Sequence, residues 1–438
     1  MKPNCFEKRK HLFHIMVSIA VLLFNGQTYA QKPGMYVDGR YLYTNSGERV
    51  ILKGFNAMIV YWDIHGNVNF PEMEKTGANT CRIFWNLAYP TPQPADLDLV
   101  LSNCIKYKMI PIICLWDATG KWDQLPTCVD YWCSPVISAI LKKYEKNLLV
   151  NIANEPGDKA MGDAIFKEKY ADIVKQMRTA NIHTPLIIDA DQYGRNADAV
   201  LDNGQYLLDQ DPDHNLIFSW HLWDPKTWGT GTISEIERII NKAVEKNICF
   251  IVGEFGPCEN CDKCPTSAIN WEYLIEKAYK NDIGYLAWVW KWSDCHSVVS
   301  NSSGKYGTWA NSTWGEKIAV SHPYSIKTTS VRPSNLQTGN ENISSGSHSL
   351  VVYPNPSNRE IFFDLTLTEQ SEVEIKIVDT RGKDAHVLIQ RTLVPGRVKL
   401  TWDPKKAGEA GSSGMYIFSA KIKNTKGIFS ESGKLFSL

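Results

Sequence analysis

The sequence has no excess of charge of either sign. Lysine and arginine together number 47, as do aspartate and glutamate, so the formal net charge is zero. A balanced chain has no electrostatic reason to bind nucleic acid or an anionic membrane surface. It also has no glycine-rich phosphate loop after its first strand-like segment, so no nucleotide cofactor is indicated. These absences argue against nucleic-acid-binding, membrane-surface-binding and nucleotide-dependent proteins.

The sequence also lacks an apolar run long enough for a comfortable membrane span. A basic stretch, residues 8–10, precedes apolar residues 12–24, and Ala30 offers a small-residue cleavage point. This is the pattern of a secretory signal peptide. Cys5 lies before the apolar stretch, so it is not placed as a lipoprotein-type anchor. We expect residues 1–30 to be removed and the protein to be secreted.

Removal of the signal leaves ten of the eleven cysteines, and an even count in an exported protein suggests disulfides. Cys128 and Cys133 bracket a short segment and are expected partners. Four more form a cluster: Cys258, Cys261, Cys264 and Cys295. Their C-x-x-C-x-x-C run also looks like a zinc site, with Cys295 or His296 as the fourth ligand. Outside a reducing compartment we favour disulfides, and the sequence does not fix the pairing.

Eight short apolar runs alternate with helical patterns between residues 34 and 325. They are rich in isoleucine, leucine and valine without polar alternation, which is typical of strands buried on both faces. The runs are Val50–Asn56, Thr80–Trp85, Met109–Trp116, Leu148–Asn154, Pro185–Asp189, Ile217–His221, Ile248–Glu254 and Gly284–Trp290. Eight strand–helix units in this length predict an α/β fold, a (β/α)8 TIM barrel.

The clearest helical patterns lie between these runs. They cover residues 95–107, 135–145, 164–180, 234–246 and 268–281. Ser234 is an expected helix cap, with Glu237 three residues on. Before the first run, Met35–Thr44 predicts a hairpin that turns at Asp38-Gly39 and closes the bottom of the barrel.

The composition changes after the barrel. Residues 326–349 are rich in Ser, Thr, Asn and Gly, which predicts a linker between a barrel domain at 31–325 and a domain at 350–438. The last domain has short alternating runs that predict a small antiparallel β-sandwich. These runs are Ile361–Leu367, Val373–Val378, Val398–Trp402 and Met415–Ile422.

Two carboxylates stand out by position. Glu155 follows the fourth apolar run in Asn-Glu-Pro, and Glu254 ends the seventh in Gly-Glu-Phe-Gly. A barrel carries its reactive groups at the carboxyl ends of its strands, and a charge that interrupts an apolar run must be paired or hydrogen-bonded. Retaining glycoside hydrolysis uses two carboxyl groups about 5–5.5 Å apart, one as proton donor and one as nucleophile. The pair therefore predicts glycoside hydrolysis, which needs no metal.

Three further residues lie at the same end of the predicted barrel. Arg82 would keep the nucleophile ionised, Asn154 would hold the substrate 2-hydroxyl, and His221 would hydrogen-bond in the same cavity. Taken singly, Arg82 is also interpretable as a structural ion-pair residue and His221 as a core histidine. Of the 15 tryptophans, all but Trp402 precede residue 315, and such rings stack on sugar faces.

On these residues the chain resembles glycoside hydrolase family 5, and within it the bacterial endo-β-1,4-mannanases. The resemblance covers about residues 34–320, with matching stretches Gly77–Arg82, Asn154–Pro156, Phe218–His221, Gly253–Gly256 and Gly284–Trp290. It implies Glu155 as acid/base and Glu254 as nucleophile, supported by Arg82, Asn154 and His221. It also implies that Trp288 or Trp290 forms the floor under the sugar at the cleavage point.

Two positions depart from the family pattern. Trp116, before Asp117, stands where the family usually has a histidine, and Trp223 stands where it usually has a tyrosine. Tryptophan donates one hydrogen bond but cannot accept or titrate. We expect Trp116 and Trp223 to contact the substrate in an active enzyme with an altered innermost subsite.

The C-terminal domain resembles a type IX secretion sorting domain, through Val352–Ser357 and Gly414–Phe418. This implies the type IX machinery as a partner and an extracellular or surface-attached product after the domain is removed. The alternative is a carbohydrate-binding sandwich. For the barrel, the first prediction is cleavage of β-1,4-mannan. The alternatives are another β-glucan (cellulose, glucomannan or xyloglucan) and a polysaccharide-binding barrel without turnover.

Overall fold

A computed structural model describes residues 32–88, 91–310, 314–337, 348–353, 360–367, 369–379, 384–403, 414–425 and 427–437. The expected signal peptide, residues 1–30, lies outside the described residues. Among the helices that are described, none is both long enough and apolar enough to cross a membrane.

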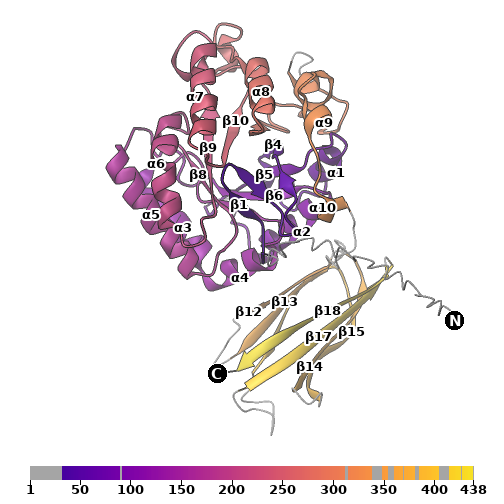
Figure 1. Cartoon of the computed structure of the whole chain (residues 1–438). Helices are drawn as coiled ribbons and strands as arrows, with labels where there is room; N and C mark the ends of the chain where they lie inside the picture. Colours follow the sequence, from indigo (N-terminus) through magenta and orange to yellow (C-terminus); the bar gives the residue numbers. More distant parts are fainter. Residues whose placement is uncertain are drawn as a thin grey trace, which may run out of the picture. The chain divides into compact units, whose positions relative to one another are not determined.

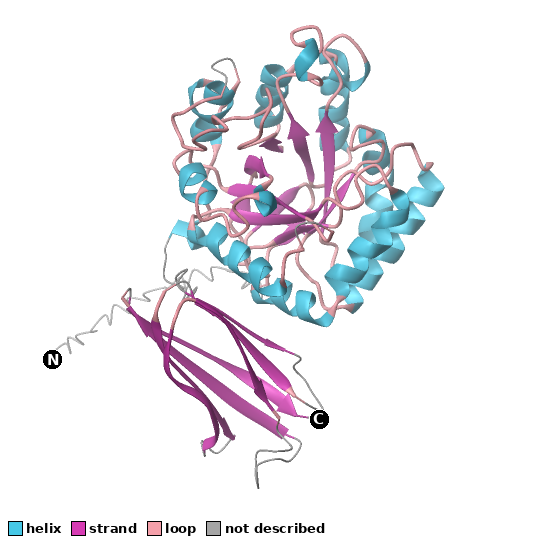
Figure 2. Ribbon diagram, turned by 180° about the vertical axis from the view of Figure 1, so that it is seen from behind, coloured by secondary structure: helices cyan, strands magenta, loops and turns pink. Residues whose placement is uncertain are grey.

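Eight parallel strands close into a barrel, as the sequence predicts. They follow one another in chain order, and the last pairs with the first to close the ring. Helices surround the strands (Figures 1 and 2). The strands are β4 (Lys53–Ala57), β5 (Thr80–Trp85), β6 (Ile110–Leu115), β7 (Leu149–Asn151), β8 (Leu186–Asp189), β9 (Leu216–Leu222), β10 (Phe250–Phe255) and β11 (Gly284–Ala287).

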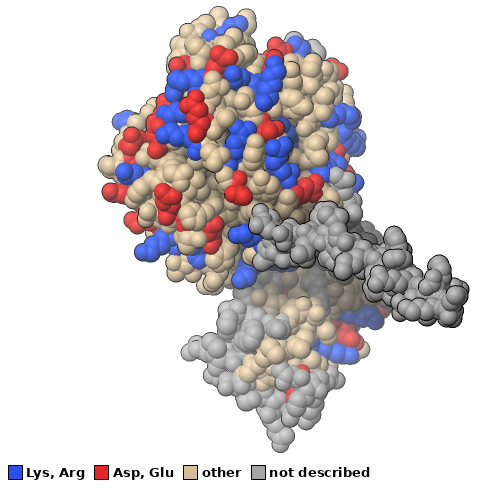
Figure 3. All heavy atoms as spheres, in the orientation of Figure 1, with Lys and Arg blue, Asp and Glu red and all other residues tan. Residues whose placement is uncertain are grey.

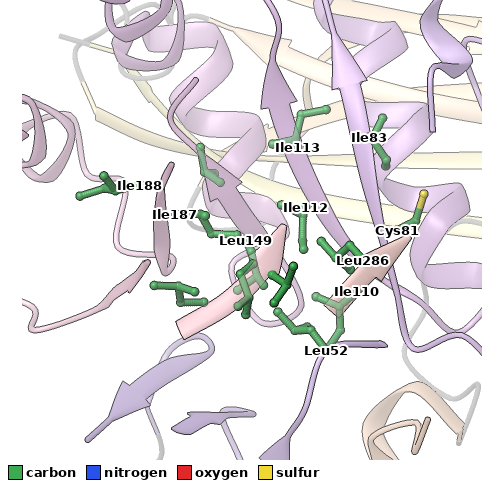
Figure 4. Packing of buried hydrophobic residues seen from close by; sticks show 14 of the residues in the cluster. Leu52, Cys81, Ile83, Ile110, Ile112, Ile113, Leu149, Ile187, Ile188 and Leu286 are labelled. Atoms are coloured by element: carbon green, nitrogen blue, oxygen red, sulfur yellow. The ribbon is translucent and has the colours of Figure 1, made fainter. Parts of the chain in front are cut away.

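The barrel strands are buried on both faces, which explains their unbroken apolar runs. Every residue of β5, β6, β9 and β10 is buried. Figure 4 shows side chains of neighbouring segments, among them Ile112, Leu149 and Leu286, packed together in this core. On the face seen in Figure 3, basic and acidic side chains are interspersed over the surface.

The expected helices are present within a few residues of their predicted bounds. The helices of the barrel are α1 (Asn69–Glu74), α2 (Pro94–Lys106), α3 (Leu125–Cys133), α4 (Pro135–Lys143), α5 (Asp163–Thr179), α6 (Ala197–Gln210), α7 (Ile233–Glu245) and α8 (Trp271–Lys280). The predicted cap Ser234 was wrong. Helix α7 begins at Ile233, and Oγ1 of Thr232 accepts from the Glu235 backbone N at 3.3 Å. Thr232 and Glu235 have the same three-residue spacing as the predicted pair, Ser234 and Glu237, but they lie two residues earlier in the chain.

A small antiparallel sheet lies at the amino-terminal end of the barrel. It consists of β1 (Tyr36–Asp38), β2 (Tyr41–Tyr43) and β3 (Arg49–Val50). The backbone N of Val37 donates to Oδ1 of Asn215 at 2.9 Å, and Asn215 directly precedes β9. The predicted hairpin is therefore confirmed, opposite the carboxyl ends of the strands.

The beginning of the expected linker belongs to the barrel. Residues 326–337 form two short helices, α9 (Ile326–Thr329) and α10 (Ser334–Gln337). Ile326 and Leu336 are buried in the barrel core, and Nδ2 of Asn79 donates to the carbonyl of Val331 at 2.8 Å. The linker prediction was wrong for residues 326–337 because two apolar side chains, Ile326 and Leu336, pack this polar segment against the barrel. Of the rest of the predicted linker, residues 338–347 lie outside the described residues, and residues 348–349 begin strand β12.

The C-terminal residues form two antiparallel sheets, in the orders β12-β13-β16 and β15-β14-β17-β18. Both sheets contribute to one apolar core, which includes Trp402. Its burial removes the ring from a sugar-binding surface. Pro354–Ser357, part of the sorting motif, lie outside the described residues. The strands are β12 (His348–Tyr353), β13 (Ile361–Leu367), β14 (Ser371–Asp379), β15 (Asp384–Leu393), β16 (Gly396–Trp402), β17 (Gly414–Asn424) and β18 (Gly427–Ser437).

Candidate active site

The two glutamates meet at the carboxyl end of the barrel. Glu155 lies just after β7, and Glu254 lies near the end of β10. One carboxylate oxygen of each lies within 4.8 Å of the other and of a His221 ring nitrogen. Glu155 is 8% exposed and Glu254 is 3% exposed. The two carboxyl groups therefore lie close together in a largely buried environment, although they are far apart in the sequence.

Arg82, in β5, is fully buried beneath this pair. Its Nη1 donates to Oε1 of Glu254 at 2.7 Å, and its Nη2 donates to Oδ2 of Asp189 at 2.9 Å. Its Nε donates to Oδ1 of Asn151 at 2.8 Å. Because a buried guanidinium needs partners on every side, this network fixes the side chain as a rigid fork. Arg82 thus holds Glu254 in place.

Asn154 links Arg82 to the loop after β6. Its Oδ1 accepts from Nη2 of Arg82 at 2.8 Å, and its Nδ2 donates to Oγ1 of Thr119 at 2.9 Å. The amide plane is therefore fixed from both sides, directly before Glu155. An amide nitrogen carries two hydrogens, so one remains beyond the bond to Thr119.

His221, in β9, contacts three carboxyl groups. Its Nδ1 lies 2.7 Å from Oε1 of Glu155 and 3.6 Å from Oε2 of Glu254. Its Nε2 lies 3.5 Å from Oδ2 of Asp189. Burial lowers the pKa of His221, but Glu254 and Asp189 outweigh it and raise the pKa to about 10. The neighbouring carboxylates therefore favour the imidazolium form of His221.

Two glycines make room for His221. A Cβ on Gly253 would lie 2.8 Å from Nε2 of His221 and 2.2 Å from Oγ of Ser219. A Cβ on Gly194 would lie 2.5 Å from Cγ of His221, and Gly194 has a φ of 74°. The pairing of β10 with β9 shifts register beside Gly253, which places Glu254 opposite His221. The glycine in Gly-Glu-Phe-Gly therefore serves the packing of His221.

Asp189, at the end of β8, is a site residue that the sequence analysis missed. Its Oδ2 accepts from Arg82 and, at 3.1 Å, from the backbone N of Glu155. Burial raises the pKa of Asp189, but Arg82 and His221 lower it to about 2. The signal was available, because Asp189 ends an apolar run just as Glu254 does. Glu155 itself has a φ of 43°, so its backbone is held in the left-handed region by this bond and its neighbours.

Aromatic rings form one wall of the site. The indole Nε1 of Trp223 donates to Oε2 of Glu254 at 3.2 Å. The ring centroid of Trp288 lies 6.3 Å from that of Trp223 and 5.1 Å from that of Phe84. Trp116 packs edge-to-face on Phe84 at 5.6 Å. Of the two tryptophans that depart from the family pattern, Trp223 thus contacts Trp288 directly and Trp116 contacts it through Phe84.

Trp290 lies apart from this wall. It is 1% exposed and packs on Phe55, with ring centroids 5.0 Å apart, inside the barrel core. Trp288 is only partly buried and contacts the cluster of Met58, Phe84 and Val289. Of the two tryptophans named in the sequence analysis, Trp288 is therefore the one whose ring is available to a ligand.

The cysteine cluster contains two disulfides, Cys258–Cys264 and Cys261–Cys295. Their sulfurs are therefore not thiolates, and the zinc alternative does not fit. The predicted Cys128–Cys133 bridge was wrong, and both residues are free. They lie on the single helix α3, where side chains five positions apart face in different directions.

The chain matches known families in two places. Residues 123–294 match the model described as cellulase (glycosyl hydrolase family 5), and residues 351–429 match the secretion system C-terminal sorting domain. A mannan endo-1,4-beta-mannosidase from Salipaludibacillus agaradhaerens is 26% identical over 290 residues, which are 65% of this chain and 90% of that protein. One from Cellvibrio japonicus (strain Ueda107) is 24% identical over 330 residues, 74% of each chain.

Solved structures share the barrel fold. The catalytic domain of a mannanase from Streptomyces sp. SirexAA-E has a TM-score of 0.61 at 23% identity, covering 70% of this chain and 96% of that chain. The mannohexaose complex of the Thermomonospora fusca beta-mannanase has a TM-score of 0.60 at 24% identity, with 69% and 99% covered. At this identity the likeness shows the fold alone.

Proposed function

Because the chain is a glycoside hydrolase with a family 5 cellulase domain, we propose that it is a retaining endo-β-1,4-mannanase. Glu254 attacks the anomeric carbon of the sugar while Glu155 donates a proton to the leaving oxygen. Water, deprotonated by Glu155, then attacks the covalent glycosyl–enzyme and releases Glu254. Configuration at the anomeric carbon is retained because it is inverted twice.

The spacing of the carboxyl groups carries this proposal. Their nearest oxygens lie within 4.8 Å. Retaining enzymes place the two groups about 5–5.5 Å apart, whereas inverting enzymes leave about 6.5–9.5 Å for a water molecule. The observed gap fits the separation of a retaining enzyme and is shorter than the separation of an inverting one.

Hydrogen bonding supports the assignment of the two roles. Both oxygens of Glu254 accept hydrogen bonds, one from Arg82 and one from Trp223, which favours the ionised form. In the described part of the chain, the carboxyl group of Glu155 is bonded to His221 through Oε1. Its Oε2 is therefore the oxygen that would carry the proton to the leaving group.

The charges of the site agree with one proton shared by the carboxyl groups. Arg82 and His221 are two cations, and Glu155, Asp189 and Glu254 are three acids. Burial raises the pKa of Glu254 to about 7, although His221 and Arg82 oppose the rise. A single proton on the pair of glutamates makes the cluster neutral, and we assign it to Glu155 because Glu254 has two donors.

The remaining residues serve the sugar at the cleavage point. We propose that the second amide hydrogen of Asn154 binds the 2-hydroxyl and that Trp288 forms the floor of the subsite. We propose that Trp223, which contacts Trp288, and Trp116, which packs on Phe84, also contact the sugar. The mannan preference is supported by the relatives named as mannan endo-1,4-beta-mannosidases.

Two other functions follow from the same residues. The same mechanism would act on cellulose, glucomannan or xyloglucan if the outer subsites favour them. A binding protein without turnover is motivated by Trp116 and Trp223, but the bond from Trp223 to Glu254 favours an enzyme. A pure binder would not need a nucleophile held by two donors.

Sugar release from mannan, glucomannan and carboxymethyl cellulose tests the proposal. We expect mannan to be cleaved fastest, with the β-anomer as the first product by NMR. A fluorinated mannoside should label Glu254, and azide should restore activity to Glu155→Ala by replacing water as the nucleophile. Glu276→Gln, on the exposed face of α8, is the matched control. An α-anomeric first product, or binding with equal near-zero turnover in wild type and Glu155→Ala, would contradict the mechanism.

The C-terminal sorting domain indicates type IX secretion and extracellular or cell-surface localisation. We propose that the type IX machinery recognises this domain and that it is then removed from the barrel. A mass measurement on protein exported by a type IX-competent bacterium tests this, since retention of residues 350–438 would contradict removal.

A further inference from the structure

The loop after β10 contains two disulfides, and one of them ties it to the segment after β11. Cys258–Cys264 closes a short loop, with its Cα atoms 6.1 Å apart. Cys261–Cys295 spans 34 positions, with its Cα atoms 5.6 Å apart. The second bridge therefore joins two barrel segments next to the proposed nucleophile on β10.

His296 directly follows the second bridge and is held inside this loop. It is 8% exposed, and its Nε2 donates to the carbonyl of Cys258 at 2.8 Å. Its Nδ1 lies 3.5 Å from Sγ of Cys261 and 3.1 Å from Oδ1 of Asp294. The backbone carbonyl of His296 accepts from Nε1 of Trp314 at 2.8 Å. Ring and backbone are thus both fixed.

The imidazole ring packs against the ring that donates to Glu254. The centroids of His296 and Trp223 lie 5.3 Å apart, with the rings nearly perpendicular at 87°. A Cβ on Gly256 would lie 2.8 Å from the His296 ring and 3.1 Å from the Trp223 ring. Glycine at this position therefore lets both rings approach the backbone that follows β10.

We propose that His296 is a positioning residue that holds Trp223 in its hydrogen bond to Glu254, and that the Cys261–Cys295 disulfide holds His296 in turn. An edge-to-face contact restricts the indole more than an aliphatic neighbour would. His296 acts through Trp223. This inference rests on the proposed function, in which Glu254 is the nucleophile.

The alternative is a disulfide loop that only stabilises the fold. Removing it would then lower the melting temperature and leave the pH dependence of catalysis unchanged. A loosened Trp223 would instead lose its hydrogen bond to the ionised form of Glu254. The pKa of Glu254 would then rise, and a larger fraction of Glu254 would be protonated at low pH. The acid limb of the kcat/KM profile therefore separates the two explanations.

The experiment compares His296→Ala, His296→Phe and Cys261→Ser/Cys295→Ser with wild type on mannan across pH. We expect the acid limb to move to higher pH by up to about two units in His296→Ala and in the double serine variant, the full effect of losing one hydrogen bond to a charged group. His296→Phe keeps an aromatic edge on Trp223 and should stay closer to wild type. His322→Ala, whose ring packs on Trp271 at 5.7 Å, is the matched control and should not move the limb.

Coupling to Trp223 completes the test. In Trp223→Phe the donor is already absent, so adding His296→Ala should move the limb no further. An unmoved limb in folded His296→Ala, or a further shift in the double variant, would overturn the inference while the hydrolase function stands. If His296→Ala does not fold, a wild-type limb in the double serine variant overturns it. A wild type inactive on every β-glycan would overturn the proposed function, and this inference with it.

Discussion

The indole N–H of Trp223 donates to Oε2 of Glu254 at 3.2 Å. Trp223 stands where the resembled family usually has a tyrosine, so the substituted residue keeps one donor on the proposed nucleophile. Together with the bond from Arg82 to Oε1, it gives each carboxylate oxygen a partner. The departure from the family pattern therefore preserves a donor to the carboxylate.

Trp223→Phe should move the acid limb of the kcat/KM profile to higher pH. A donor to the ionised carboxylate lowers its pKa, so its loss raises the pKa of Glu254 above about 7. At a pH below that value more Glu254 is protonated and the rate falls. We expect a shift of about one to two pH units, since a hydrogen bond to a charged group is worth about 1.5–3 kcal/mol and one pH unit corresponds to about 1.4 kcal/mol. Trp228→Phe, an exposed ring that is 51% accessible, serves as control. A limb that moves downward would contradict the bond's proposed effect.

The sequence was sufficient for the barrel and for its two glutamates because both signals are local. An apolar run without alternation marks a strand buried on both faces, and a glutamate at its end marks the carboxyl edge of the barrel. Asp189 carries the same signal, but its importance arises from Arg82 and His221, which other strands supply. Contacts between different strands of a barrel cannot be predicted from the pattern of any single segment.

The cysteines illustrate the same limit. Cys261 pairs with Cys295 because the segments after β10 and β11 lie side by side, which spacing alone does not reveal. Cys128 and Cys133 were predicted to pair because they are close in the chain. Both lie on helix α3, however, and their side chains point away from different faces of it. Residues 326–337 looked like linker by composition, yet buried Ile326 and Leu336 hold them to the barrel. For Cys261 and for residues 326–337 the deciding contact is long-range, whereas for Cys128 and Cys133 it is the geometry of one helix.

Asp189→Ala should destabilise the barrel strongly. Asp189 is buried, and its loss leaves Arg82 and His221 without a compensating charge. Breaking a buried ion pair from one side costs about 3–5 kcal/mol. The control is Asp198→Ala, whose carboxylate pairs with Arg238 at 41% exposure of both side chains and should cost about 0.2–1 kcal/mol. Urea unfolding measures both, and equal losses would contradict the buried network.

His221→Gln should lose its stability difference from wild type as the pH rises. The pKa of His221 is raised to about 10 in the folded protein, against about 6.5 for an unperturbed histidine. Its charge therefore contributes fully below about 6.5, and this contribution is lost as the pH rises through about 10. Urea unfolding of both proteins across this range measures the difference. A constant gap would show that His221 is neutral in the folded state.

Gly253→Ala should impair folding and activity together. The added Cβ would lie 2.2 Å from Oγ of Ser219 and 2.8 Å from Nε2 of His221, so β9 or His221 must move. Movement of His221 withdraws it from Glu155, to which it is bonded at 2.7 Å. Gly162→Ala is a useful comparison, because no atom lies within 4 Å of its added Cβ although its φ of 82° is strained. Thermal melting and mannan hydrolysis measure the two effects. Equal activity in both variants would contradict a steric effect at His221.

Trp288 and Trp290 should separate ligand binding from folding. Trp290→Ala removes a fully buried ring packed on Phe55 and should cost about 3–5 kcal/mol of unfolding free energy. Trp288→Ala truncates a partly buried ring beside Trp223 and Phe84, so it should unfold closer to wild type. If Trp288 is the floor under the sugar, its loss should lower kcat/KM and weaken oligosaccharide binding. Urea unfolding and calorimetric titration with a mannooligosaccharide, carried out where both variants are folded, compare the two. Wild-type affinity in Trp288→Ala, with weakened affinity in folded Trp290→Ala, would reverse the assignment, because a ligand would then depend on the buried ring.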